Sequence, residues 1–121
     1  MSKNTILIVD DDELITEEFE SLFQEEGYNV ILAYNGQEGL DAFEKNEKID
    51  FVLSDIKMPV MDGVEFIKNL KSIGNSVPFI FMTGYSDYTE EDLLSLGVNA
   101  VLFKPFDVEA LLNTVAGMLR I

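Results

Sequence analysis

The sequence predicts an α/β fold in which a doubly wound parallel sheet carries helices on both faces. Five short apolar runs alternate with five segments of helical periodicity along 121 residues. The runs are nearly continuous, which is typical of strands buried on both faces of a parallel sheet. No linker or low-complexity segment interrupts this order. We therefore expect one domain over residues 1–121.

The first unit begins with the strand Thr5–Val9, an aliphatic run rich in β-branched residues. The helix Glu13–Glu26 follows, capped by Asp12 and ended by Gly27. Its apolar stripe, which we expect to face the core, is Leu14, Ile15, Phe19, Leu22 and Phe23.

The next two units repeat this order. The expected strands are Tyr28–Ala33 and Asp50–Ser54, and the expected helices are Gly36–Asn46 and Val64–Ile73. Leu40 and Phe43 are the apolar contacts of the first of these helices, and Gly74 ends the second.

The last two units are shorter. The expected strands are Pro78–Met82 and Ala100–Phe103, and the expected helices are Tyr88–Leu96 and Asp107–Leu119. Thr89 offers an N-cap for the first of these helices. Val108, Leu111, Leu112, Val115 and Leu119 are expected to face the core from the last helix.

Polar residues follow four of the five strands. These residues are Asp10 and Asp11 after the first strand, Asp55 after the third, Thr83 at the end of the fourth and Lys104 after the fifth. In an open parallel sheet, ligands bind beyond the carboxyl ends of the strands, where the winding reverses. A flavodoxin-like (βα)5 sheet with strand order 2-1-3-4-5 gathers all of these residues at one edge.

Composition limits the chemistry of this edge. The chain has no cysteine and no histidine, so a metal must be held by oxygen, which points to Mg²⁺ or Ca²⁺. The net charge of −15 argues against direct binding of nucleic acid or an anionic membrane. No run is long enough to span a bilayer, so we expect a cytoplasmic protein.

Three carboxylates in one cleft repel one another strongly, so either one of them stays protonated or a divalent cation neutralises them. Mg²⁺ suits this set, and a carboxylate beside it can attack a phosphoryl donor to form an acyl phosphate. Lys104 would stabilise the transferring oxygens, and the Thr83 hydroxyl could donate to them.

The chain resembles the receiver domain of two-component response regulators over essentially its full length. The stretches that carry the resemblance are ILIVDDDELI (6–15), DFVLSDIKMPVMDG (50–63), PFIFMTGYSD (78–87) and VLFKPFDVEAL (101–111). It implies that Asp55 is the phosphoacceptor. It also implies that Asp10, Asp11, Asp55 and the backbone carbonyl of Lys57 bind Mg²⁺.

The resemblance gives further residues a place in the site. Thr83 and Lys104 would bind phosphoryl oxygens, Pro105 would follow a typically cis peptide, and Gly84 would leave room for the phosphate. One position departs from the family, because Val101 stands where Tyr or Phe usually forms the conformational switch. Residues that could substitute for it are Tyr85, Phe103 and Phe106.

The resemblance also implies partners. A histidine kinase or phosphotransfer protein would supply the phosphoryl group, and the surface of the fourth and fifth helices and fifth strand would contact an unknown downstream target or a fused output domain. The chain would not be a conventional enzyme, since it would catalyse only its own phosphorylation and dephosphorylation. It could be a monomer or a phosphorylation-dependent dimer, and a natural single-domain regulator or part of a longer protein.

Other functions fit less well. A haloacid-dehalogenase-like phosphatase also begins with an Asp10-x-Asp12 pattern, but Leu14 replaces the expected Thr or Val. A dinucleotide site needs a glycine-rich first turn, and an EF-hand loop needs a central glycine; both are missing after Val9. The more serious alternative is a pseudo-receiver that acts through protein contacts without phosphorylation.

Overall fold

The computed structural model describes residues 4–45, 48–84, 88–104 and 107–119. Its sheet has five parallel strands in the order β2-β1-β3-β4-β5, as the sequence predicted. The strands are β1 (Thr5–Val9), β2 (Asn29–Ala33), β3 (Phe51–Ser54), β4 (Phe79–Thr83) and β5 (Ala100–Phe103). The helices are α1 (Glu13–Glu25), α2 (Gly36–Lys45), α3 (Gly63–Ser72), α4 (Glu90–Leu94) and α5 (Val108–Leu119).

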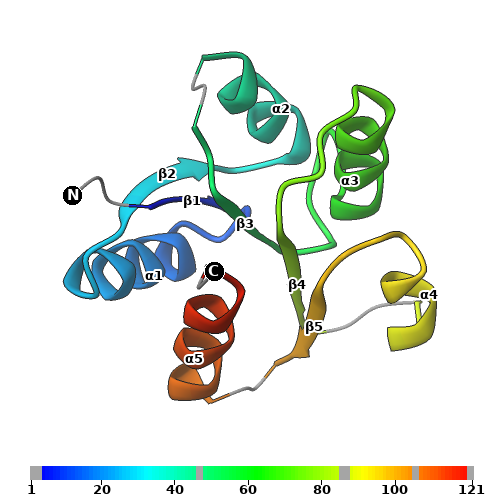
Figure 1. Ribbon diagram of the computed structural model, residues 1–121. Helices are drawn as coiled ribbons and strands as arrows, with labels where there is room; N and C mark the ends of the chain where they lie inside the picture. The colour runs from blue at the N-terminus through cyan, green and yellow to red at the C-terminus, as the bar shows by residue number, and fades with distance from the viewer. Residues whose placement is uncertain (1–3, 46–47, 85–87, 105–106, 120–121) are drawn as a thin grey trace.

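The helices cover the sheet in two layers (Figure 1). α1 and α5 lie on one face, and α2, α3 and α4 lie on the other. Each face has its own hydrophobic core, because successive residues of a strand point to opposite sides of the sheet. The doubly wound arrangement follows from this division.

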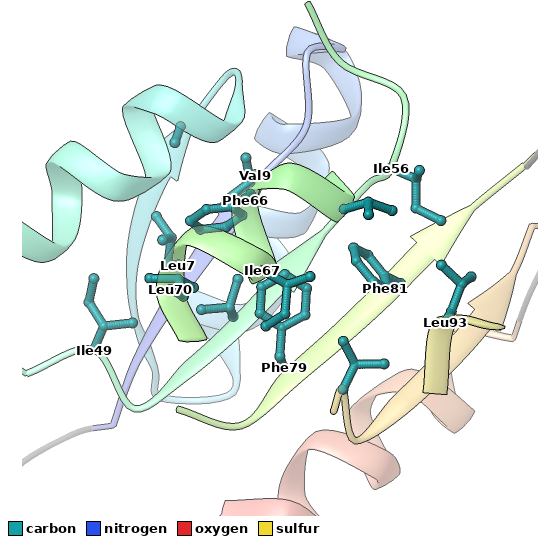
Figure 2. Close-up of a cluster of buried hydrophobic side chains, with 14 of the residues drawn as sticks. Leu7, Val9, Ile49, Ile56, Phe66, Ile67, Leu70, Phe79, Phe81 and Leu93 are labelled. Carbon is teal, nitrogen blue, oxygen red and sulfur yellow. The ribbon is translucent and has the colours of Figure 1, made fainter. Parts of the chain in front are cut away.

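The core under α2, α3 and α4 is rich in aromatic side chains (Figure 2). Phe66, Phe79 and Phe81 are fully buried, with ring centroids 5.6 Å apart for the first pair and 5.0 Å for the second. On the other face, Phe23 of α1 and Leu111 of α5 pack against the sheet. The contacts among the rings of Phe66, Phe79 and Phe81 add stabilisation beyond the apolar area that these side chains bury.

The predicted elements agree with the structure except at their ends. Asp12 caps α1 by accepting hydrogen bonds from the N–H groups of Leu14 and Ile15. Thr89 begins α4 with a reciprocal capping box, but this helix is shorter than the predicted Tyr88–Leu96. Asn46, the predicted end of α2, lies outside the described residues.

Two residues expected in the core are on the surface. Leu14 is 72% exposed and Val108 is 43% exposed. Both lie in the first turn of their helices. These first turns lie beyond the carboxyl edge of the sheet, so the described strands do not extend beneath them. In α1 the buried side chains are Thr16 and Phe23.

None of the helices within the described ranges is long and apolar enough to cross a membrane.

Candidate functional site

Three carboxylates meet where β1 and β3 end. Asp10 and Asp11 follow Val9, Asp55 follows Ser54, and Val9 and Ser54 are paired in adjacent strands. One carboxylate oxygen from each aspartate lies within 4.8 Å of the others. Asp10 is buried, Asp55 is half-buried and Asp11 is exposed, so the cluster opens to solvent on one side.

Lys104 reaches this cluster from the end of β5. Its Nζ lies 3.4 Å from Oδ2 of Asp55 and 3.6 Å from Oδ2 of Asp10. The ammonium therefore bridges two carboxylates that come from different strands. One lysine offsets only part of the charge of three aspartates.

Burial changes the protonation of Asp10. Its pKa is raised from 3.8 to about 6, with desolvation by burial as the largest cause, and the charges of Asp55 and Asp11 act in the same direction. The hydrogen bond from the N–H of Asp12 and the charge of Lys104 act in the opposite direction. Asp10 thus remains protonated at a pH where an exposed aspartate is ionised.

The backbone fixes the direction of Asp55. Its N–H donates to the carbonyl of Val9 at 2.9 Å, which extends the β1–β3 ladder by one residue. Its Oδ1 accepts a hydrogen bond of 2.7 Å from the N–H of Ile56. Oδ2 is left facing Lys104, so the two oxygens of the carboxylate have different surroundings.

The other predicted site residues lie around this cluster. Thr83 is buried at the end of β4, and its carbonyl accepts a hydrogen bond of 2.7 Å from the N–H of Lys104. Lys57 is exposed, two residues after Asp55. Gly84 is exposed, and among the described residues a Cβ there would meet Lys104, at 3.8 Å. Pro105 lies outside the described residues.

Two further residues contact Asp55 that were not predicted to belong to the site. The hydroxyl of Ser54 donates a hydrogen bond of 2.7 Å to the carbonyl oxygen of Asp55. A Cβ on Gly63 would overlap that same oxygen, so only glycine allows this approach. The polar Ser54 in an otherwise apolar strand was the available signal, and Gly63 looked like ordinary turn chemistry.

The donor set fits a hard divalent cation. It consists of carboxylate oxygens, and no described hydrogen-bond donor satisfies Oδ2 of Asp10, which is buried. A buried acidic oxygen without such a donor is costly unless a cation or proton balances it, and Lys104 at 3.6 Å balances only part of the charge of the cluster. Mg²⁺ takes one or two carboxylates and keeps open positions for water or phosphate oxygens. Chemically, the cluster can bind Mg²⁺ and present Asp55 as a nucleophile.

Comparison with known proteins identifies relatives along nearly the whole chain. The sequence model described as the response regulator receiver domain matches residues 6–116. Sporulation initiation phosphotransferase F of Bacillus subtilis (strain 168) is 37% identical over 116 residues, which cover 95% of this chain and 93% of that protein. YkoG of the same organism, an uncharacterised transcriptional regulatory protein, is 34% identical over 99% of this chain. The chain spans only 53% of YkoG.

Solved structures show the same fold. A CheY-like response regulator receiver domain protein from Methanospirillum hungatei JF-1 has a TM-score of 0.87 at 34% identity, with 98% of this chain and 94% of that chain covered. The response regulator protein TrrA from Thermotoga maritima, in complex with Mg²⁺-BeF, has a TM-score of 0.84 at 33% identity. That match covers 95% of this chain and 98% of TrrA.

Proposed function

Because the chain belongs to the family of response regulator receiver domains of two-component systems, we propose that Asp55 accepts a phosphoryl group in a Mg²⁺-dependent reaction. The observation that carries this proposal is the position of Asp55. Its carboxylate lies beside Asp10 and Asp11 and 3.4 Å from the ammonium of Lys104. A nucleophile, a set of hard-cation ligands and a fixed positive charge thus occupy one edge of the sheet.

The transfer begins when a carboxylate oxygen of Asp55 attacks the phosphorus of the donor. The bond from phosphorus to the leaving atom breaks, and its electron pair stays with the donor. The leaving atom is an imidazole nitrogen if the donor is a phosphohistidine, and a carboxylate oxygen if it is a small acyl phosphate. Asp55 then carries an acyl phosphate.

Asp10, Asp11, Asp55 and the backbone carbonyl of Lys57 would hold the metal. When bound, Mg²⁺ neutralises the carboxylates and the oxygens of the transferring group. The structure of TrrA in complex with Mg²⁺-BeF supports the proposal that this site takes Mg²⁺. Lys104 pairs with Asp55 before the transfer and would form an ion pair with a phosphoryl oxygen afterwards. The Thr83 hydroxyl would donate a hydrogen bond to another phosphoryl oxygen.

The acyl phosphate would act by shifting the population between two conformations. Val101 is buried in the core at the position where the family usually has an aromatic switch residue, so the relay must use another side chain. Among the described residues Phe103, 45% exposed at the end of β5, is available. Tyr85 and Phe106 lie outside the described residues.

The output surface would be formed by α4, β5 and α5. Its exposed apolar side chains are Leu94, Phe103 and Val108. The phosphodonor would be a histidine kinase or phosphotransfer protein, and the downstream partner a separate protein or a fused domain. The chain itself would act in the cytoplasm. The reaction would be confined to phosphorylation and dephosphorylation of this chain. The pseudo-receiver alternative is not favoured, since within the described part of the site Lys104 lies beside Asp55.

Intact mass after incubation with acetyl phosphate tests the proposal. The wild type should gain one phosphoryl group in Mg²⁺ and none in EDTA, and Asp55→Asn should gain none. Asp62→Asn is the matched control, because Asp62 is an aspartate of the same loop that only caps α3, a role that Asn also performs. If folded wild type with Mg²⁺ forms no adduct, the result would contradict this proposal and favour the pseudo-receiver alternative.

A further inference from the structure

Ser54 is a buried polar side chain that the proposed transfer does not use. It ends β3, where the residues before it are apolar and fully buried, and its own exposed fraction is 0%. Its hydroxyl donates a hydrogen bond of 2.7 Å to the carbonyl oxygen of Asp55. A hydroxyl in such a place is unfavourable unless it is hydrogen-bonded, so this contact is the one that makes a serine tolerable here.

The peptide group between Asp55 and Ile56 connects this contact to the carboxylate. Its carbonyl accepts from Ser54, and its N–H donates to Oδ1 of Asp55 at 2.7 Å. Because the carbonyl and N–H belong to one planar unit, rotation of that unit moves both together. Gly63 also lies directly against the same carbonyl oxygen.

We propose that Ser54 is a positioning residue for the phosphoacceptor. Its hydroxyl fixes the peptide plane after Asp55, and the N–H of that plane fixes the Asp55 carboxylate opposite Lys104. This inference rests on the proposed function of Asp55. Without the hydroxyl, the plane rotates more freely and the carboxylate spends less time in line with the donor, which slows the transfer itself.

The kinetic test compares Ser54→Ala with a matched loss of another buried hydroxyl. Thr16 is fully buried in α1, and its hydroxyl donates to the carbonyl of Glu13 at 2.9 Å, so Thr16→Val is the control. In saturating Mg²⁺, Ser54→Ala should lower the maximal rate of phosphorylation by acetyl phosphate about ten-fold. The donor concentration for half-maximal rate should stay within about two-fold, since donor contacts are intact. Thr16→Val should keep the wild-type rate, and Ser54→Thr should recover most of it.

A second readout needs no donor. Amide hydrogen exchange followed by NMR should become faster at Ile56 in Ser54→Ala. It should not change at Asp10, whose N–H donates to the carbonyl of Ala33. Unchanged exchange at Ile56, an unchanged rate, or equal slowing in Thr16→Val would each overturn the inference. If wild type itself forms no adduct, the proposed function fails, and the exchange of Ile56 still decides whether Ser54 holds the peptide.

Discussion

Asp10 shows how burial of a single carboxyl sets a pH dependence. Its folded-state pKa of about 6 lies above its ordinary value of 3.8. Between these values the folded state therefore holds more protons than the unfolded state, and the free energy of unfolding falls as pH rises. The fall is complete above pH ~7 and amounts to at most about 3 kcal/mol, at about 1.4 kcal/mol per unit.

Asp10→Asn should remove this dependence. The amide has no titration in this range, and its oxygen can still accept the N–H of Asp12, which bonds Oδ1 of Asp10 at 2.9 Å. In EDTA at pH 7.5 the variant should be more stable than wild type by about 1–3 kcal/mol, and near pH 4 the difference should almost vanish. Urea unfolding at the two pH values measures it. A difference of equal size at both would contradict the raised pKa.

Val60 has a backbone conformation that suits glycine. Its φ is 68°, and its side chain is 80% exposed, so little burial offsets the strain. The left-handed region costs a β-branched residue about 1–2 kcal/mol, while glycine is penalised mainly through the entropy of the unfolded chain. Val60→Gly should therefore raise the free energy of unfolding by about 0.5–1 kcal/mol. Val60→Ala keeps most of the strain and should change stability less in the same denaturant titration.

Contacts between elements explain where glycine is required in a helix. α2 approaches α3 so closely that a Cβ on Gly39 would lie 2.7 Å from the ring of Phe66, which is fully buried. Gly39→Ala should lower the free energy of unfolding by about 1–3 kcal/mol, because the ring has no room to move. No described residue outside the helix's own backbone lies within 4 Å of a Cβ added to Gly117 in α5, so Gly117→Ala should instead stabilise by up to about 1 kcal/mol. Equal effects in thermal unfolding would contradict this account.

The elements themselves could be predicted from the sequence, but their contacts could not. Apolar runs and helical stripes are local patterns, and Asp12 and Thr89 act as the N-caps that their types suggested. The prediction that Leu14 is buried was wrong, because the apolar stripe of a helix does not reveal where the sheet beneath that helix ends. The need for glycine at position 39 depends on the facing ring of Phe66, which periodicity does not place.

The topology of the whole molecule determines how much of the site could be predicted. Parallel strands end at one edge, so polar residues after β1, β3 and β5 and at the end of β4 had to gather there. The distance of Lys104 from Asp55 and the burial of Asp10 depend on side-chain packing and had to be seen in the structure. The roles of these residues in phosphorylation remain predictions.

The charge of the whole chain separates two ways in which Mg²⁺ can stabilise it. With 23 acidic and 8 basic residues, the excess negative charges of the folded chain repel one another, and any salt weakens that repulsion. Specific binding at Asp10, Asp11 and Asp55 adds a term that grows with the ratio of Mg²⁺ concentration to Kd. This term reaches about 1.4 kcal/mol at ten times Kd.

Thermal unfolding at constant ionic strength distinguishes the two. Replacing NaCl with MgCl₂ at equal ionic strength should raise the Tm of the wild type, because specific binding then adds to whatever Mg²⁺ does to the diffuse charge. Asp11→Asn should lose most of that rise while keeping its response to NaCl, since Asp11 is exposed and its replacement leaves the core intact. The same rise in both proteins would mean that Mg²⁺ acts on the diffuse negative charge, and the metal site would then have to be placed elsewhere than around Asp11.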